Sequence, residues 1–169
     1  VEMKYSVGYR LRDENNNPFA QSLCEISDYI YEVYFPWIST ESGRALLDDQ
    51  RGEIDWNSQA YLEEDLTELK KKGIRLNLLM NGNCYGEKAV SKYLRNKIYS
   101  ILDHLCDIGC GVDSVTTTSP FIASIVRERY KDIEKITSVN MVIKTQKGIE
   151  YIKDIFDVFY LKREHNRDI

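Results

Sequence analysis

The chain has 169 residues, with 23 lysine and arginine residues against 27 aspartate and glutamate residues, and a formal net charge of −4 at pH 7. This length suits one domain with a hydrophobic core. The mild acidity argues against a protein whose whole surface attracts nucleic acid or an anionic membrane. No apolar run approaches the roughly 20 residues of a membrane span, and the first residues lack the layout of a signal peptide. We therefore expect a cytoplasmic protein without membrane contact.

Segments typical of strands and of helices alternate along the chain without a linker. Strands are expected at Tyr5–Tyr9, Asp28–Phe35, Arg75–Asn81, Asp113–Thr118, Lys135–Ile143 and Val158–Lys162. Helices are expected at Phe19–Glu25, Gln59–Lys72, Pro120–Tyr130 and Thr145–Phe156, and where Val90, Leu94, Ile98, Ile101, Leu102 and Leu105 recur at helical spacing. The segment Ser39–Asp49 is irregular, and both a helix and an elaborated loop fit it. The serial order of strands and helices predicts a parallel sheet with right-handed crossovers.

The alternation of side chains within the strands favours a barrel over the alternative, an open doubly wound sheet. The polar parity comprises Arg10, Glu32, Asn77, Asn81, Ser138, Asn140 and Lys162. The apolar parity comprises Val7, Tyr9, Val33, Phe35, Leu76, Leu78, Met80, Val139 and Met141. An open sheet with helices on both faces would be apolar on both parities, whereas a barrel turns one parity toward its interior.

We therefore predict an α/β fold of serial β-α units, a parallel (β/α)8 TIM-type barrel of which about six strands are present. An eight-stranded barrel typically needs about 250 residues. Residues 1–169 are accordingly expected to form a single domain, the N-terminal portion of such a barrel, incomplete at its C-terminus.

The turn after the third expected strand is a candidate for chemistry. Asn81 and Asn83 offer amide donors beside the thiol of Cys84, within a segment that contains two glycines. An Asn-Gly turn selected for backbone geometry alone explains the same residues. A nucleophilic Cys84 would need a base, and His165 could approach it only across the mouth of a barrel.

The four cysteines, Cys24, Cys84, Cys106 and Cys110, do not indicate a metal centre. Cys106 and Cys110 lie four residues apart at a helix end, but no histidine or cysteine partner is close enough in sequence to complete a tetrahedral set, and Cys84 and Cys24 could join them only as distant partners. We expect ordinary thiols and no metal ligands in this chain.

Two further clusters follow expected strands. The run Thr116–Pro120 ends the fourth strand with hydroxyls, including that of Thr117, that are expected to face the barrel mouth and could hold an anion with the amides of the next helix. Threonine is also simply a good strand former, and Ser119 a helix cap. The sixth strand leads into a polar run that contains Arg163, Glu164 and Arg167. Arg163 suits a carboxylate or phosphate ligand, whereas a charge run near a terminus is usually only solvated.

Three segments, DSVTTTSPFIASIVRERY, ITSVNMVIKTQKGIEYIKDI and DVFYLKREHNRD, together resemble the middle of the collagenase-like peptidase family, peptidase family U-thirty-two, or U32. In that family a strand ends near a Ser-x-Gln/Asn-Met motif, and the next strand ends in an Arg-Glu pair. Here Ser138–Met141 and Arg163–Glu164 occupy those places. The resemblance is best over residues 113–169 and rests on strand order elsewhere.

The resemblance implies an eight-stranded barrel and a protein labelled as a peptidase. Other members take part in prephenate-dependent hydroxylation of RNA bases or of a quinone with an iron–sulfur cluster. Their cluster cysteines lie downstream of the Arg-Glu strand, so the resemblance implies no cofactor within this chain and a possible cluster in a full-length protein. Asn140 stands where Gln is frequent, and His165–Asn166 replace the usual Leu-Ser, which leaves substrate and reaction open.

The leading hypothesis is part of a U-thirty-two peptidase-like barrel enzyme that is not active alone and binds a peptide or a small anionic substrate. The candidate catalytic residues are Glu164, Glu32 and Cys84. The candidate substrate-binding residues are Arg10, Asn81, Asn83, Thr117, Ser138, Asn140, Arg163 and Arg167. The alternatives are part of a cluster-dependent hydroxylase from the same family, and a non-catalytic subunit that pairs with itself or with a partner chain through open barrel edges.

Overall fold

The computed structural model describes residues 3–12, 15–38, 40–42, 56–161 and 164. Its strands are β1 (Tyr5–Gly8), β2 (Ile30–Pro36), β3 (Arg75–Met80), β4 (Ser114–Thr117), β5 (Glu134–Thr137) and β6 (Val158–Phe159). Its α-helices are α1 (Phe19–Glu25), α2 (Trp56–Lys71), α3 (Lys92–Asp107), α4 (Pro120–Arg129) and α5 (Gln146–Ile152). Short 3₁₀ helices are η1 (Ser27–Tyr29), η2 (Gly86–Lys88) and η3 (Val139–Met141). None of these described helices is long and apolar enough to cross a membrane.

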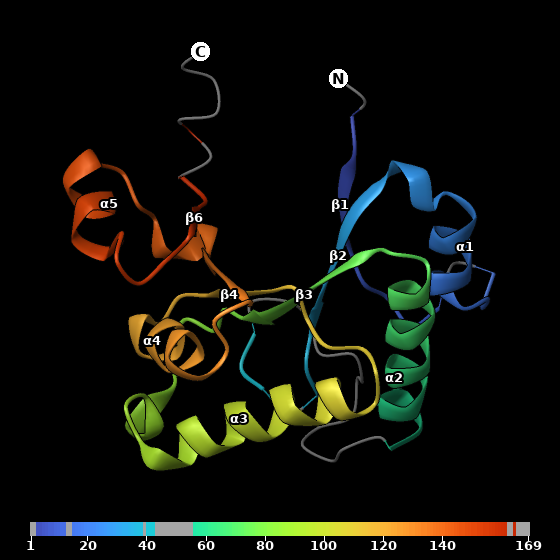
Figure 1. Ribbon diagram of the computed structural model, residues 1–169, viewed down its shortest axis with the longest axis horizontal. Coiled ribbons are helices and arrows are strands. Elements are labelled where there is room, and N and C mark those ends of the chain that lie inside the picture. The colour runs from blue at the N-terminus through green and yellow to red at the C-terminus, as the bar shows by residue number, and fades with distance from the viewer. Residues whose placement is uncertain (1–2, 13–14, 39, 43–55, 162–163, 165–169) are drawn as a thin grey trace.

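The six strands form one parallel sheet in the order β1-β2-β3-β4-β5-β6. A doubly wound sheet would reverse its strand order at a switch point, whereas unbroken sequential order with right-handed crossovers places every helix on the same face. Figure 1 shows the sheet curled, with the helices arranged around its outer side. The predicted TIM-type architecture is therefore confirmed as a six-stranded half-barrel.

The hydrophobic core lies between the outer face of the sheet and the helices. Val33, Phe35, Leu76, Leu78 and Val115 point outward from the strands and are completely buried. The residues that the helices contribute to this core include Leu62, Leu66, Leu69, Ile98, Leu102 and Leu105. Within the strands, the apolar parity read from the sequence is thus the helix-facing side, and the polar parity is left for the inner face. Val139 is an exception, because it lies beyond β5 in η3 and lines the inner side.

A bulge in β2 changes which side chains reach the inner face. Tyr5 of β1 pairs with Ile30, but the next residue, Ser6, pairs with Glu32, so Tyr31 has no partner in β1. Ile30 packs in the core, while the ring of Tyr31 lies 5.3 Å from the guanidinium carbon of Arg75. The bulge therefore turns both Tyr31 and Glu32 toward the interior.

Two predicted elements were wrong in extent. The strand expected to run to Ile143 ends at Thr137, because the chain turns into η3, where the Ser138 hydroxyl accepts a hydrogen bond from the backbone N–H of Asn140 at 3.2 Å. Val90 was expected on the buried face of a helix but precedes α3 and is 76% exposed, since α3 begins only after Ser91. Most of Ser39–Asp49, and Lys162, lie outside the described residues.

Candidate ligand-binding site on the inner face

A cavity of about 380 Å³ lies on the inner face of the half-barrel. It extends from the middle of the sheet to the carboxyl ends of the strands, where α/β barrels carry their sites. The lining residues are Ser6, Glu32, Tyr34, Asn77, Leu79, Asn81, Thr116, Ser138, Val139, Asn140 and Tyr160. We call this space the inner cavity.

A chain of three buried side chains crosses the wall of the inner cavity. The Thr116 hydroxyl donates a hydrogen bond of 2.9 Å to the Asn77 side-chain oxygen. That bond directs the Asn77 amide nitrogen toward Glu32, where it lies 3.4 Å from each carboxylate oxygen. Glu32 and Asn77 are each only 2% exposed. The described residues supply no other hydrogen-bond donor to Glu32, so a ligand in the cavity can use its remaining acceptor capacity.

Tyr160 brings a phenol to the same cavity. Its backbone N–H donates to the Thr137 hydroxyl at 2.8 Å, which fixes the chain just beyond β6. Burial raises the pKa of Tyr160, and the nearby carboxylate of Glu32 raises it further. The phenol therefore keeps its proton at neutral pH and can donate it in a hydrogen bond to a ligand.

Amide groups form the rim at the carboxyl ends of β3 and β5. The side chain of Asn140 donates to the backbone oxygen of Asn81 at 3.5 Å. The side-chain oxygen of Asn81 accepts a hydrogen bond of 2.9 Å from the Ser42 hydroxyl. Ser138 lies beside them in the lining. These contacts hold two asparagine side chains at the cavity edge.

An ion pair lies toward the amino ends of the strands. Arg75 and Glu134 are 2.5 Å apart at their closest side-chain atoms, and Arg75 also stacks on Tyr31. The Arg75 Nε atom and the hydroxyl of Ser114 are buried without a partner among the described residues. Arg75 is thus paired with a carboxylate, and among the described residues the lining of the inner cavity includes no lysine or arginine.

The structure brings four of the predicted site residues together in the inner cavity: Glu32, Asn81, Ser138 and Asn140. The prediction that Thr117 faces the site was wrong, because Thr117 is completely buried and its hydroxyl accepts from the backbone N–H of Ser119 at 3.0 Å. Its neighbour Thr116 lines the cavity instead. A shift of one residue moves a strand side chain to the other face.

The other predicted residues lie apart from the inner cavity. Arg10, Asn83 and Glu164 are exposed and absent from its lining. Cys84 is also exposed, and its sulfur accepts a hydrogen bond from the backbone N–H of Gly86 at 3.3 Å. Arg163, Arg167 and His165 lie outside the described residues.

Among the described cavity residues, sequence reasoning assigned no site role to Ser6, Tyr34, Asn77, Leu79, Val139 and Tyr160. Asn77 belongs to the polar parity, and Tyr34 shares the parity of Glu32, so strand alternation could have found both. Tyr160 required the register of its strand, and only the register of β4 separates Thr116, which lines the cavity, from Thr117, which does not. Among the described residues, no group of three or more histidine, cysteine, aspartate or glutamate side chains could hold a metal ion.

No protein-family model and no curated protein sequence matches the chain. Among solved structures, the U32 peptidase Mk0906 superposes with a TM-score of 0.67 at 17% identity, over 98% of this chain and 61% of that one. A psychrophilic glycoside hydrolase family 10 endo-beta-1,4-xylanase superposes with a TM-score of 0.50 at 9% identity, over 96% and 67% of the two chains. The resemblance seen in short motifs is thus confirmed at the level of the fold, and the chain spans 61% of the length of the U32 peptidase structure.

Proposed function

We propose that this chain is the substrate-binding part of a U-thirty-two peptidase-like barrel protein, and that the inner cavity binds a peptide. The observation that carries the proposal is the position of Glu32, a carboxylate only 2% exposed that lines the cavity and is held by Asn77. Buried carboxylates with a cavity beside them are typical of acid–base sites.

The lining suits a peptide better than a small anion. A peptide N–H would donate to Glu32, and a peptide carbonyl would accept from Tyr160 or from the amide of Asn140. Leu79 and Val139 supply apolar walls for a side chain. The described part of the lining includes no lysine or arginine, so within it an anion would lie near the Glu32 carboxylate with no positive side chain to compensate it.

The same groups would supply the acid–base part of amide-bond hydrolysis. Glu32 would take a proton from a water molecule as its oxygen attacks the carbonyl carbon, and would then give that proton to the leaving nitrogen. The phenol of Tyr160 would donate a hydrogen bond to the carbonyl oxygen as negative charge develops there. Cys84 has no part in this scheme because it does not line the cavity.

Catalysis, in this proposal, needs further elements of a longer protein or of a partner chain, whereas ligand binding does not. Within the described part of the chain, β1 and β6 each pair on one side only. A second copy or another chain could therefore pair with these edges. Light scattering coupled to size-exclusion chromatography would support this arrangement by showing a dimer and would contradict self-association by showing a monomer.

The test is peptide binding. Short peptides blocked by N-acetyl and C-terminal amide groups would be titrated into the chain and followed by NMR. We expect binding that Glu32→Gln weakens at least tenfold, while Glu25→Gln, an exposed substitution on α1, leaves it unchanged. The proposal would be overturned if no blocked peptide bound, or if Glu32→Gln bound as tightly as the native chain.

A further inference from the structure

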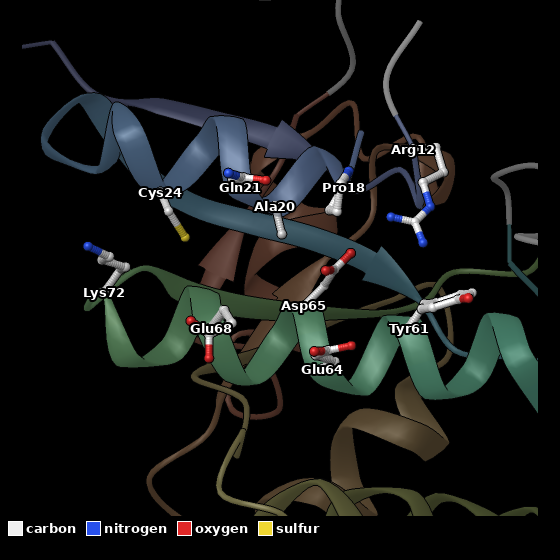
Figure 2. A pocket seen from close by; sticks show the side chains of 10 residues that line it. All are labelled: Arg12, Pro18, Ala20, Gln21, Cys24, Tyr61, Glu64, Asp65, Glu68 and Lys72. Atoms are coloured by element: carbon white, nitrogen blue, oxygen red, sulfur yellow. The ribbon is translucent and has the colours of Figure 1, made fainter. Parts of the chain in front are cut away.

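A second cavity, of about 390 Å³, lies between α1 and α2 on the outer side of the half-barrel (Figure 2). We call it the outer cavity. Helix α1 presents the small residues Ala20 and Cys24 to it, whereas α2 presents Asp65 and Glu68. The small side chains of α1 leave space between two helices that would otherwise pack closely.

Asp65 provides a buried acceptor in the middle of the outer cavity. It is only 9% exposed, and the Tyr9 hydroxyl donates to its Oδ2 atom at 2.7 Å. The described residues provide no hydrogen bond to its second oxygen, Oδ1. Figure 2 shows the carboxyl group pointing from α2 toward α1, into the space between the helices. The second oxygen therefore faces the cavity as an acceptor that the donor group of a ligand can use.

A cation lines the same cavity without pairing with that carboxylate. The guanidinium of Arg12 packs over the ring of Tyr61, with its carbon 4.6 Å from the ring centroid. In the described part of the chain Arg12 makes no ion pair. Asp65 and Arg12 line the same cavity but form no salt bridge with each other. The carboxylate of Asp65 can therefore bind a cationic group of a ligand, and the guanidinium of Arg12 can bind an anionic group.

We propose that the outer cavity binds a free α-amino acid. The ammonium group would donate to Asp65 Oδ1, and the carboxylate would accept from the guanidinium of Arg12. The side chain would extend between Cys24 and Glu68 toward Lys72, which lies at the far end of the cavity (Figure 2). The volume is ample for one such molecule, since small-molecule sites typically measure about 300–1,000 Å³.

Two other ligand classes fit the outer cavity less well. A simple anion would meet three carboxylates, those of Glu64, Asp65 and Glu68. A metal ion would need several converging oxygens, but in the described residues no three acidic, histidine or cysteine side chains come together as a metal site. A zwitterion satisfies both the carboxylate of Asp65 and the cation of Arg12.

The experiment titrates the 169-residue chain with each standard L-amino acid by calorimetry, and then tests the best ligand as its N-acetyl and its amide derivative. We expect one or a few amino acids to bind, and both derivatives to bind at least tenfold more weakly. Asp65→Asn and Arg12→Gln should each weaken binding at least tenfold. The amide oxygen introduced by Asp65→Asn would still accept a hydrogen bond from Tyr9, and circular dichroism would show that both variants fold.

Two control variants make the result decisive. Glu25→Gln changes an exposed charge on α1 away from the cavity and should leave amino-acid binding intact. Glu32→Gln, in the inner cavity, should also leave it intact, so this proposal can fail or succeed independently of peptide binding. The proposal is contradicted if no amino acid binds, or if neither Asp65→Asn nor Arg12→Gln weakens the binding.

Discussion

The side-chain amide of Asn77 lies 3.4 Å from both carboxylate oxygens of Glu32, although the two residues are 45 positions apart in the chain. The hydroxyl of Thr116 fixes the orientation of this amide from the other side. Three neighbouring strands thus contribute one side chain each to a single buried network. The position of the proposed acid–base group consequently depends on strand pairing rather than on any local motif.

Substituting Asn77 by leucine should destabilise the protein. Leucine is similar in size but cannot accept from Thr116 or donate to Glu32, so two buried polar groups would lose their partner. Such losses cost about 1–3 kcal/mol each. Denaturant unfolding should therefore show a clear fall in the free energy of unfolding. The exposed control Asn83→Leu should change it by less than about 0.5 kcal/mol, and an equal effect of both substitutions would contradict the network.

The pKa of Tyr160 should report the charge on Glu32. Burial is the larger cause of the raised pKa of this phenol, and the Glu32 carboxylate is the second. In Glu32→Gln the pKa should therefore fall toward the ordinary value of tyrosine without reaching it. NMR titration of ¹³C-labelled tyrosine would measure the change. An unaltered Tyr160 pKa in this variant would mean that Glu32 carries no charge near the phenol.

The outer cavity should make stability depend on pH through Asp65. Burial raises the pKa of this carboxyl group, although the hydrogen bond from Tyr9 works in the opposite direction. The folded state thus holds the proton more tightly than the unfolded state, and stability falls as the pH rises through the folded-state pKa. Asp65→Asn should remove this fall, so the variant should gain in melting temperature relative to the native chain between pH 3 and pH 7.

A constant difference in melting temperature over that range would contradict a raised pKa for Asp65. Glu68→Gln is a useful comparison, because the hydrogen bond from Lys71 lowers the pKa of Glu68. Any pH effect of that substitution should have the opposite sign.

Asp157 should anchor β6 through its charge. Burial alone would raise the pKa of Asp157, but hydrogen bonds from the side chain and backbone of Lys135 and from Arg127 lower it below its ordinary value. The carboxylate therefore adds stability above the unfolded-state pKa, and this stability is lost as the pH falls through the folded-state pKa.

Asp157→Asn should lower the free energy of unfolding at pH 7 by about 1–2 kcal/mol, a modest value because the Asp157 side chain is partly solvated. Lys135, by contrast, is only 3% exposed and would lose its charged partner. The difference from the native chain should shrink in acid. Asp154→Asn, at a nearby exposed position, serves as the control. A loss that persisted unchanged at pH 2 would show that the charge is not the cause.

Gly73 should resist substitution for a purely conformational reason. It follows α2 with a φ of +76°, and a Cβ atom added there would meet nothing within 4 Å. Gly73→Ala should therefore cost about 1 kcal/mol of stability through backbone strain alone. Gly111→Ala is the matched control, because Gly111 has no positive φ and its Cβ would make an ordinary contact at 3.7 Å. Equal melting temperatures for the two variants would contradict this explanation.

The sequence predicted the architecture well because burial follows strand and helix periodicity. Val33, Leu76 and Leu78 were assigned to the helix-facing side from alternation alone, and all three are buried there. Alternation likewise assigns Glu32 to the opposite side, and Glu32 lines the inner cavity. Ser138 and Asn140 also line it, but they do so from the turn after β5 rather than from a strand. Alternation fails where the backbone departs from a regular strand, as it does at the Tyr31 bulge and in the turn after Thr137.

The barrel and the polar character of its interior are therefore encoded locally in the sequence, since both follow from short-range patterns of side-chain polarity. Tertiary structure alone decided that Thr116 and not Thr117 joins Asn77, and that Tyr160 approaches Glu32. It also created the outer cavity by placing Ala20 and Cys24 against Asp65. These relationships join residues far apart in the chain, and their geometry depends on register and packing that no local pattern encodes.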